Sequence, residues 1–479
     1  MRLEIHPTIF REYDIRGIAE KQLSSEFARY LGMAYARLIE GRKPVAGRRN
    51  LTVSVGRDCR LTSDAYSNAL IAGLTASGID VVNLGICPTP LSYYSLFHLD
   101  LDGGIMITGS HNTADYNGFK ICVGRETIHG SKIQEVRKIM EDLSRSDGTE
   151  KTAPGDVRNY PIIPKYIEYL VNHAKIRDPK RIVLDAGNGT ASTVAPELFK
   201  RLGAQVIPLY CDMDGRFPNH HPDPTVPENL KDLVKTVLKE KADLGIAFDG
   251  DSDRIGVVDE KGKILFGDEI MVLFSRSILK EKPGATIISE VKSSNRLYQD
   301  IAAKGGNPIM WKTGHSLIKS KMKETSAALA GEMSGHIFFA DRYFGYDDAI
   351  YAGLRVFEIL SQSSEPLSSM LSDLPPTYST PEIRVDCEDE KKFKLVEEVK
   401  RSFSNSKFKI NDIDGIRVDF GDGWGLVRAS NTQPALVLRF EAASQNKLKE
   451  IRQIFVDSLV AGAKAIGHAP ITVPSEEAA

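Results

Sequence analysis

The sequence predicts an α/β protein with three related α/β domains and a smaller C-terminal α+β domain. Two observations predict this class. A strand–helix–strand order recurs three times at separations above 100 residues, and the order of elements changes after residue 374. The length of 479 residues also exceeds what one hydrophobic core normally supports, so several domains are expected.

The repeated order is strand, helix, glycine, strand. An amphipathic helix over 24–40 precedes the first copy, which has a strand at 51–56, a helix at 64–77 and a strand at 79–84. The second and third copies have strands at 181–185 and 205–209, and at 285–289 and 308–311. Each helix is followed by a glycine (Gly78, Gly203, Gly305), which suits the left-handed position after a helix end.

Polar segments mark two boundaries between domains. The segment 144–155 ends the first unit, and Leu374-Pro375-Pro376-Thr377 ends the third. Strands at 382–385, 415–420, 425–429 and 435–441, with helices at 390–403 and 446–466, then predict the α+β domain. The expected domains are 1–153, 154–254, 255–373 and 374–467, and the tail 468–479 is expected to be disordered.

The composition excludes several classes of partner. The 62 Lys and Arg residues nearly balance the 64 Asp and Glu residues, so no global charge draws the chain to nucleic acid or to membranes. No apolar run reaches the roughly 18 residues needed to span a bilayer, and the first residues lack the apolar core of a secretion signal. We expect a cytoplasmic protein, in which the five scattered cysteines are free thiols.

Thr108-Gly109-Ser110-His111-Asn112 is the candidate catalytic segment. It follows the apolar run 104–107 and is small, polar and glycine-containing, which is typical of a loop at the end of a strand. We expect Ser110 to carry a phosphoryl group. A serine hydroxyl needs a neighbouring base, charge or metal to become a good nucleophile, so the loop alone does not establish this role.

The segment Asp249-Gly250-Asp251-Ser252-Asp253-Arg254 is the candidate metal site. Three carboxylates at every second position, between two predicted strands, suit a hard cation such as Mg²⁺. An EF-hand loop would need glycine where Arg254 stands, and helices in place of the strands. An acidic surface turn is disfavoured because three like charges repel one another without a cation. Arg254 is expected to grip a phosphate or a carboxylate.

Arg428-Ala429-Ser430-Asn431-Thr432 is the candidate phosphate site. One guanidinium, two hydroxyls, an amide and backbone N–H groups can hold a dianionic phosphate. Taken alone, however, the segment fits a polar hairpin end better.

Three further segments supply candidate sugar-binding groups. In Gly331-Glu332-Met333-Ser334-Gly335-His336, Glu332 and Ser334 can meet sugar hydroxyls, and His336 either transfers a proton or is merely packed. Lys292 and His315 follow strands of the third unit, where ligand groups of open α/β sheets tend to lie.

Together these motifs resemble the α-D-phosphohexomutase superfamily, from about residue 8 to about residue 465. The loop 108–112 is similar to the phosphoserine loop of the family, although Thr113 stands where proline is usual. The segment 249–254 is similar to its metal loop, and Arg428, Ser430, Asn431 and Thr432 to its phosphate site. Residues 13–17 match its N-terminal Tyr-Asp-Ile-Arg-Gly motif, which adds Tyr13 and Arg16 to the expected substrate-binding residues.

The resemblance implies three α/β domains with mixed sheets and a fourth domain around a central cleft. It also implies transfer of a phosphoryl group between O6 and O1 of a hexose phosphate, through phosphoserine and a hexose 1,6-bisphosphate. Mg²⁺ would bind Asp249, Asp251, Asp253 and the phosphorylated Ser110, with Lys120 neutralising charge on the transferring oxygens. His111, His336 and Lys120 stay unranked as proton-transfer groups, and glucose or mannose 1,6-bisphosphate is the expected activator.

The identity of the sugar substrate, and the choice among alternative functions, depend on fewer residues than the family resemblance does. Met333 resembles the bifunctional phosphomannomutase/phosphoglucomutase branch, whereas phosphoglucosamine mutases usually carry glutamine there. The alternatives are a phosphoglucosamine mutase, a phosphatase using the same serine and metal, and a non-catalytic sugar-phosphate sensor switched at Ser110. Hexose 1-phosphates and 6-phosphates are the expected partners, and the chain is expected to be a monomer or a homodimer.

Overall fold

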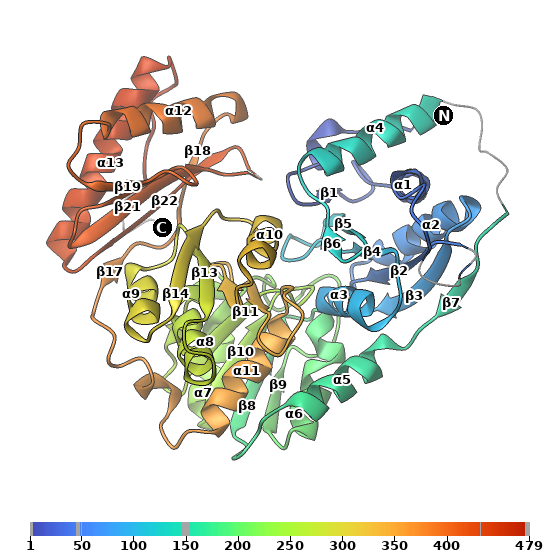
Figure 1. Cartoon of the computed structure of the whole chain (residues 1–479), viewed down its shortest axis with the longest axis horizontal. Helices are drawn as coiled ribbons and strands as arrows, with labels where there is room; N and C mark the ends of the chain where they lie inside the picture. The colour runs from blue at the N-terminus through green and yellow to red at the C-terminus, as the bar shows by residue number, and fades with distance from the viewer. Residues whose placement is uncertain (1–2, 45–47, 49, 146–152, 432, 475–479) are drawn as a thin grey trace.

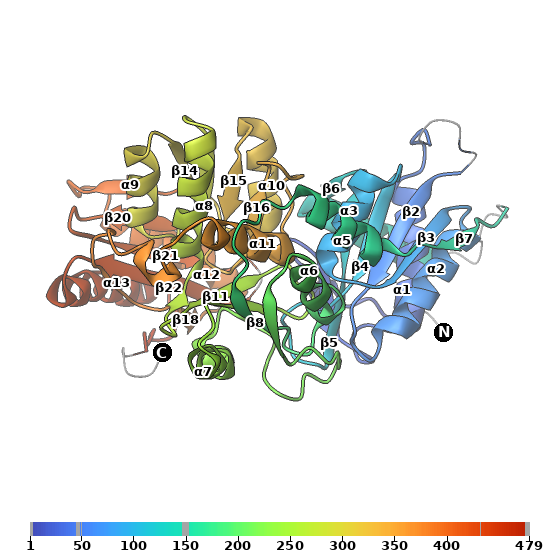
Figure 2. The ribbon, with the colours of Figure 1, turned by 90° about the horizontal axis from the view of Figure 1, so that it is seen from below.

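The computed structural model describes residues 3–44, 48, 50–145, 153–431 and 433–474, which form four sheets. The first sheet (blue to teal) and the fourth (orange to red) stand at opposite ends of the molecule (Figure 1). The second and third sheets lie between them, as the view from below shows (Figure 2). The chain therefore places its N-terminal and C-terminal units on either side of a shared middle.

The first three sheets share one arrangement, in which three parallel strands are followed by one antiparallel strand. In the first sheet these strands are, in spatial order, β3 (Asp80–Ile86), β2 (Thr52–Arg57), β4 (Gly103–Ile107) and β5 (Tyr116–Val123). In the second they are β9 (Gln205–Leu209), β8 (Arg181–Asp185), β10 (Leu244–Phe248) and β11 (Ile255–Asp259). In the third they are β14 (Asn307–Trp311), β13 (Thr286–Glu290), β15 (Leu329–Gly331) and β16 (Ile337–Phe339). The predicted threefold repeat is confirmed.

One connection is equivalent in all three sheets: the loop between the third parallel strand and the antiparallel strand. In the first sheet it is the serine loop (108–115), in the second the aspartate loop (249–254) and in the third the glutamate loop (332–336). Each follows the carboxyl end of a parallel strand, the edge at which α/β sheets present ligand groups. The repeat thus carries the three predicted segments to corresponding positions.

Helices cover these sheets. Those of the first unit are α1 (Ser25–Leu38), α2 (Ser63–Ala76), α3 (Thr89–His98) and α4 (Ser131–Arg145). The second unit contributes α5 (Ile162–His173), α6 (Ala195–Arg201) and α7 (Lys231–Glu240). The third contributes α8 (Gly267–Glu281), α9 (Asn295–Ala303), α10 (His315–Thr325) and α11 (Ala349–Ser361). None of the helices in the described part of the chain combines the length and the apolar character needed to cross a bilayer.

The fourth sheet has a different topology. Its pairs are all antiparallel, among β17 (Tyr378–Ser379), β18 (Ile383–Asp386), β19 (Lys409–Asn411), β20 (Ile416–Asp419), β21 (Gly423–Ala429) and β22 (Ala435–Ala442). The helices α12 (Asp389–Ser402) and α13 (Gln445–Ala465) pack against it. The predicted α+β domain is confirmed. The turn between β21 and β22 belongs to the arginine loop (428–434), within which Thr432 lies outside the described residues.

Two of the predicted domain boundaries cut through sheets. Strand β7 (Val157–Asn159) pairs with β3, so the first sheet extends past residue 153. Strand β11 returns beside β10 and pairs with β12 (Ile264–Leu265), so the boundary at 254/255 falls inside a hairpin. A return strand after a polar loop has the same local pattern as the start of a new unit, which explains the error. Short strands β1 (Ile15–Ile18) and β6 (Glu126–Thr127) complete the first sheet beside β5.

The predicted disorder of the tail is wrong for its first part. Ile471 is 7% exposed and packs in the core of the fourth unit, and the carbonyl of Pro474 accepts a hydrogen bond from Arg452. Residues 146–152 of the predicted linker and 475–479 of the tail lie outside the described residues.

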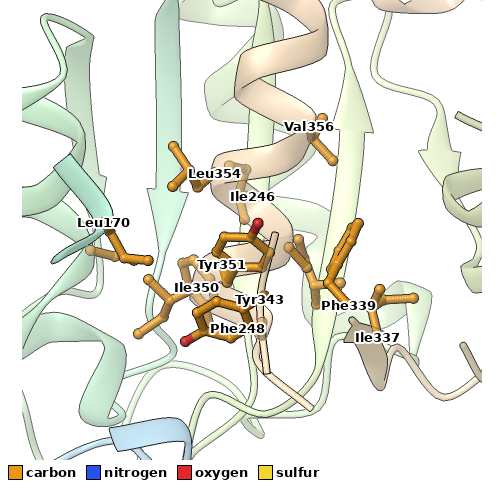
Figure 3. Close-up of a cluster of buried hydrophobic side chains, with 14 of the residues drawn as sticks. Leu170, Ile246, Phe248, Ile337, Phe339, Tyr343, Ile350, Tyr351, Leu354 and Val356 are labelled. Atoms are coloured by element: carbon orange, nitrogen blue, oxygen red, sulfur yellow. The ribbon is translucent and has the colours of Figure 1, made fainter. Parts of the chain in front are cut away.

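The largest hydrophobic core runs through the first three units. Helix α11 packs against β10 and β11 of the second sheet and β16 of the third, so Ile350 and Leu354 meet Ile246 and Phe248 of the neighbouring unit (Figure 3). The rings of Tyr343 and Tyr351 stack with their centroids 3.9 Å apart. This shared core fixes the sheets that carry the aspartate and glutamate loops.

Asp348 is a buried carboxylate at the start of α11. It accepts hydrogen bonds from the hydroxyls of Tyr166 and Tyr343, both at 2.7 Å, and from the backbone N–H of Tyr351 at 2.8 Å. Burial raises its pKa from the ordinary 3.8 to about 6, against the opposing effect of these hydrogen bonds.

This raised pKa predicts an unusual pH dependence of stability. The folded state binds the Asp348 proton more tightly than the unfolded state, so its contribution to stability is present below about pH 4 and is lost as the pH rises to about 6. Relative to the native chain, Asp348→Asn is therefore expected to gain stability on the order of 3 kcal/mol between these pH values. Thermal unfolding midpoints of both proteins from pH 4 to pH 7 test this. A constant difference between the two midpoints would contradict it.

Candidate active site

Ser110 lies at the centre of the serine loop and is 2% exposed. Its Oγ donates a hydrogen bond to Asp249 Oδ2 at 2.9 Å and lies 3.2 Å from His111 Nδ1. Burial, followed by the positive charges of Arg254 and Arg16, holds the pKa of His111 well below its ordinary value. A neutral imidazole and a carboxylate thus both face the serine hydroxyl, and both are groups that can accept its proton.

The aspartate loop brings its three carboxylates together, as predicted. Asp249, Asp251 and Asp253 are each at most 1% exposed, and one carboxylate oxygen from each lies within 4.8 Å of the others. Burial and the other two carboxylates raise the pKa of Asp249 well above its ordinary value. Among the described residues, Asp251 Oδ1 and Asp253 Oδ1 are buried without a hydrogen-bond donor. Oxygen ligands in this state fit a hard divalent cation.

The local backbone explains how the loops meet. A Cβ at Gly250 would lie 2.6 Å from the carbonyl oxygen of Ser110, so only glycine allows the two loops to approach this closely. The backbone N–H groups of Asp253 and Arg254 donate to Asp249 Oδ1 at 3.0 and 3.1 Å, which fixes the carboxylate that faces Ser110.

Lys120 lies on β5, the strand that follows the serine loop, and is 4% exposed. Its Nζ donates to Asp251 Oδ2 at 2.7 Å and also to Asp253 Oδ2. Burial opposes the charge of this ammonium, but Asp251 and Asp253 outweigh burial and raise the pKa of Lys120. Burial opposes the charge of Asp251 as well, but the positive charge and hydrogen bond of Lys120 outweigh it and lower the pKa of Asp251. A permanent cation therefore stands beside the three aspartates.

His336, from the glutamate loop, contacts the aspartate loop. Its Nε2 accepts a hydrogen bond from Arg254 Nε at 3.0 Å, so the ring hydrogen is on Nδ1 when the imidazole is neutral. That nitrogen lies 3.2 Å from Asp347 Oδ2 and 3.6 Å from Asp253 Oδ1. In the same loop Glu332 Oε1 accepts from the backbone N–H of Gly314 at 2.6 Å, while Ser334 is half-buried in the turn.

Tyr13 and His315 connect the third and fourth units to the first. The Tyr13 hydroxyl accepts from Asn431 Nδ2 at 2.9 Å and donates to the carbonyl of Thr313 at 3.1 Å. The ring of His315 lies between those of Tyr13 and His336, at centroid distances of 5.4 and 5.7 Å. Contacts therefore run without a break from the glutamate loop to the arginine loop.

The remaining basic side chains predicted for the site lie around the contacts that link the glutamate loop to the arginine loop. Arg16 NH1 donates to Asn112 Oδ1 at 2.6 Å, and Lys292 Nζ donates to Glu382 Oε2 at 2.8 Å. Arg428 is 4% exposed, and its Nε donates to Asp414 Oδ2 at 3.0 Å.

In the arginine loop, Ser430 Oγ accepts a hydrogen bond from the backbone N–H of Gln433 at 3.2 Å. A cleft of about 1000 Å³ reaches from Asn112 to Asn431, between the first and fourth units.

Four further residues hold this site and were not predicted from the sequence: Thr89, Glu290, Asp347 and Asp414. Thr89 Oγ1 donates to Asp251 Oδ2 at 2.6 Å, and Glu290 Oε1 accepts from the backbone N–H of Met333 at 2.8 Å. A Thr-Pro pair at a helix start and an Asp-Asp pair before a helix were the only local signals for Thr89 and Asp347. Both patterns are equally typical of ordinary helix caps.

The sequence matches the four domains described as phosphoglucomutase/phosphomannomutase α/β/α domains I, II and III and C-terminal domain, at residues 7–147, 164–262, 266–378 and 382–458. The chain belongs to the phosphoglucomutase/phosphomannomutase family. The predicted resemblance is thereby confirmed.

Relatives in this family match nearly the whole chain. A phosphomannomutase/phosphoglucomutase of Pseudomonas aeruginosa is 46% identical over 95% of this chain and 96% of its own length. A phosphoglucomutase of Neisseria gonorrhoeae is 45% identical over 93% of this chain and 95% of its own. The crystal structure of a family protein from Burkholderia thailandensis has a TM-score of 0.90 and 40% identity, covering 98% of this chain and 100% of that one. Phosphohexomutases of this family depend on a metal ion, and the three aspartates fit one.

Proposed function

We infer that this phosphoglucomutase/phosphomannomutase family member moves a phosphoryl group between O6 and O1 of a hexose phosphate. The contact between Ser110 Oγ and Asp249 Oδ2 supports this most directly, because it places a nucleophilic hydroxyl against a cluster of carboxylates. Mannose phosphate, glucose phosphate or both are the proposed substrates, since relatives of nearly equal identity have both names.

We propose Mg²⁺ as the cation, held by Asp249, Asp251, Asp253 and, once phosphorylated, Ser110. The ligands are all oxygen atoms, which Mg²⁺ prefers. When bound, the ion would neutralise negative charge on the transferring phosphoryl oxygens. Lys120 supplies a second positive charge at the same place, since its ammonium already bridges two of the three aspartates.

The transfer proceeds from phosphorylated Ser110 to a free sugar hydroxyl. The bond from phosphorus to Ser110 Oγ breaks as the bond to the sugar oxygen forms, and the hydroxyl proton passes to a base of the site. His336 and His111 are the proposed proton-transfer groups beside Lys120. The second transfer reverses these steps at the other end of the sugar, with a hexose 1,6-bisphosphate in between.

The bisphosphate must turn over between the two transfers, so one phosphate grip has to serve both orientations. We assign that grip to Arg428, Ser430, Asn431 and Thr432, with Arg16, Tyr13 and Lys292 around it. Glu332, Ser334 and His315 are the proposed partners of the sugar hydroxyls, and Arg254 is proposed to hold His336. Asn431, of the proposed grip, and Asn112, of the serine loop, both line the cleft between the first and fourth units.

Phosphorus NMR tests the function directly. Protein with Mg²⁺ and a trace of glucose 1,6-bisphosphate is incubated with mannose 6-phosphate, glucose 6-phosphate or glucosamine 6-phosphate in separate tubes. Appearance of a hexose 1-phosphate from mannose or glucose is the expected result. Conversion of glucosamine 6-phosphate alone would identify a phosphoglucosamine mutase. Release of inorganic phosphate without a hexose 1-phosphate would identify a phosphatase, and binding of the sugar phosphate without turnover would identify a sensor.

The proposed phosphate grip predicts a binding defect. Arg428→Lys is expected to raise KM about 10-fold for the 1-phosphate and the 6-phosphate alike, with a smaller change in kcat. The reason is that a guanidinium holds phosphate through a planar fork of donors and an ammonium does not. Steady-state kinetics in both directions measure this. Arg401→Lys, an exposed guanidinium on α12 of the same unit, is the control. A rise in KM for only one substrate would contradict a shared grip.

A further inference from the structure

Arg60 lies just after β2, and its side chain is completely buried. Its guanidinium donates to four backbone carbonyl oxygens of one segment: Ser110 at 2.7 Å, Asn112 at 2.6 Å, Thr113 at 2.6 Å and Tyr116 at 2.9 Å. All four belong to the serine loop or to the first residue after it. The loop is therefore folded around one side chain from a different part of the first unit.

These contacts act on the backbone of the nucleophile itself. Ser110 has a φ of 48°, in the left-handed region that non-glycine residues rarely adopt. The residues before it are also fixed, because Gly109 N–H donates to Asp58 Oδ2 at 3.2 Å and Ser110 N–H to Thr108 Oγ1 at 2.8 Å. With its carbonyl held by Arg60, Ser110 has its Oγ directed to Asp249. The strained conformation is thus held by its surroundings.

Arg60 also contacts the second unit. Its guanidinium lies over the ring of Phe217, 5.0 Å from the centroid, and Asp58 Oδ2 is its ion partner at 3.2 Å. A Cβ at Gly215 would lie 2.3 Å from the carbonyl of Cys59, so a glycine lets this segment of the second unit pass close to Arg60. One side chain therefore contacts both units whose serine and aspartate loops must meet.

We propose that Arg60 is a positioning residue for phosphoryl transfer at Ser110. It holds the serine backbone in the left-handed conformation and ties the serine loop to the second unit through Phe217. Arg60 acts through the backbone and does not contact the substrate, so its loss slows transfer without weakening substrate binding. The inference rests on the proposed function of Ser110.

The test follows the first half-reaction alone. Unphosphorylated protein is mixed with Mg²⁺ and excess glucose 1,6-bisphosphate, and the gain of one phosphoryl group is timed by intact-protein mass spectrometry. In this step the bond from phosphorus to the sugar oxygen breaks, the bond to Ser110 Oγ forms, and the serine proton passes to the released sugar oxygen through the base. Arg60→Lys is expected to slow it about 100-fold, because a misplacement near 1 Å costs about that much. The bisphosphate concentration for half-maximal rate should change less than about threefold.

Two variants separate positioning from folding. Gly109→Ala keeps Arg60 but would place a Cβ 2.5 Å from its Nε, so it displaces the guanidinium and should give the same slow transfer. Arg355→Lys is the matched control, because Arg355 is a buried arginine of the third unit that also contacts a carbonyl and an aromatic ring. It is expected to lower the unfolding temperature while the transfer rate stays within threefold of the native protein.

The outcomes are distinct. Slow transfer with unchanged half-saturation in Arg60→Lys and Gly109→Ala, at temperatures where both are folded, supports the assignment. Native rates in folded Gly109→Ala, or an equal slowing in Arg355→Lys, would overturn it. Failure of the native protein itself to gain a phosphoryl group would instead contradict the proposed function.

Discussion

Replacing Ser110 with alanine is expected to lower mutase activity by at least about 10⁴-fold, with little effect on folding. The hydroxyl that faces Asp249 is the proposed phosphoryl carrier, and no amount of substrate binding replaces a lost covalent carrier. The substitution removes only one oxygen atom from Ser110, which is 2% exposed, so the surrounding packing should change little. Hexose 1-phosphate formation and the unfolding temperature of the same samples measure both claims.

Ser192→Ala is a suitable control, since Ser192 Oγ donates to the carbonyl of Gly189 in the second unit and has no place in the proposed transfer. Retention of more than a few per cent of native activity in Ser110→Ala would show that another group carries the phosphoryl.

Changing Asp253 to asparagine is expected to abolish the effect of Mg²⁺ on the protein as well as its activity. Saturating Mg²⁺ should raise the unfolding temperature of the native chain by a few degrees, because an ion that binds only the folded state stabilises it. In Asp253→Asn this rise should disappear and activity should fall about 10³-fold. Without metal the substitution should change stability little, since it removes both repulsion from Asp249 and attraction to Lys120.

Thermal unfolding with and without Mg²⁺, repeated after treatment with a chelator, provides the measurement. Native protein treated with chelator should match the variant in activity and should recover when Mg²⁺ returns. A rise in unfolding temperature that persists in Asp253→Asn would place the cation elsewhere.

Much of the fold could be predicted because its signals are local. A glycine after each helix and apolar runs of strand length identify the repeat, as Gly203 and the strand 205–209 illustrate. The domain boundaries could not be placed this way. Strand β11 belongs to the second sheet only because it pairs with β10 across the aspartate loop, and pairing is not encoded in the composition of either strand.

Some residues of the candidate site could also be predicted from local signals, and others could not. Ser110 and the three aspartates could be named because each follows an apolar strand in a short polar segment. Thr89 belongs to the site because it donates a hydrogen bond to Asp251, which lies 162 residues later in the chain. Asp414 belongs to it because it accepts a hydrogen bond from the backbone of Thr313, which lies 101 residues earlier. Arg60 looks like one residue of a charged turn until its four carbonyl partners are known. Supporting residues of this kind are defined by what they face in three dimensions.

The contact between Tyr13 and Asn431 joins residues 418 positions apart, and this has a consequence for synthesis of the chain on the ribosome. Folding during synthesis generally starts from the N-terminal domain. The segment bearing Ser110 is translated before Tyr346, whose ring packs against Tyr93 of α3, so this contact of the first unit forms only later in synthesis. The nascent polypeptide thus has its proposed nucleophile long before its proposed phosphate grip. The proposed site is therefore complete only after Asn431 has been added, so a nascent chain that ends before this residue is expected to be inactive.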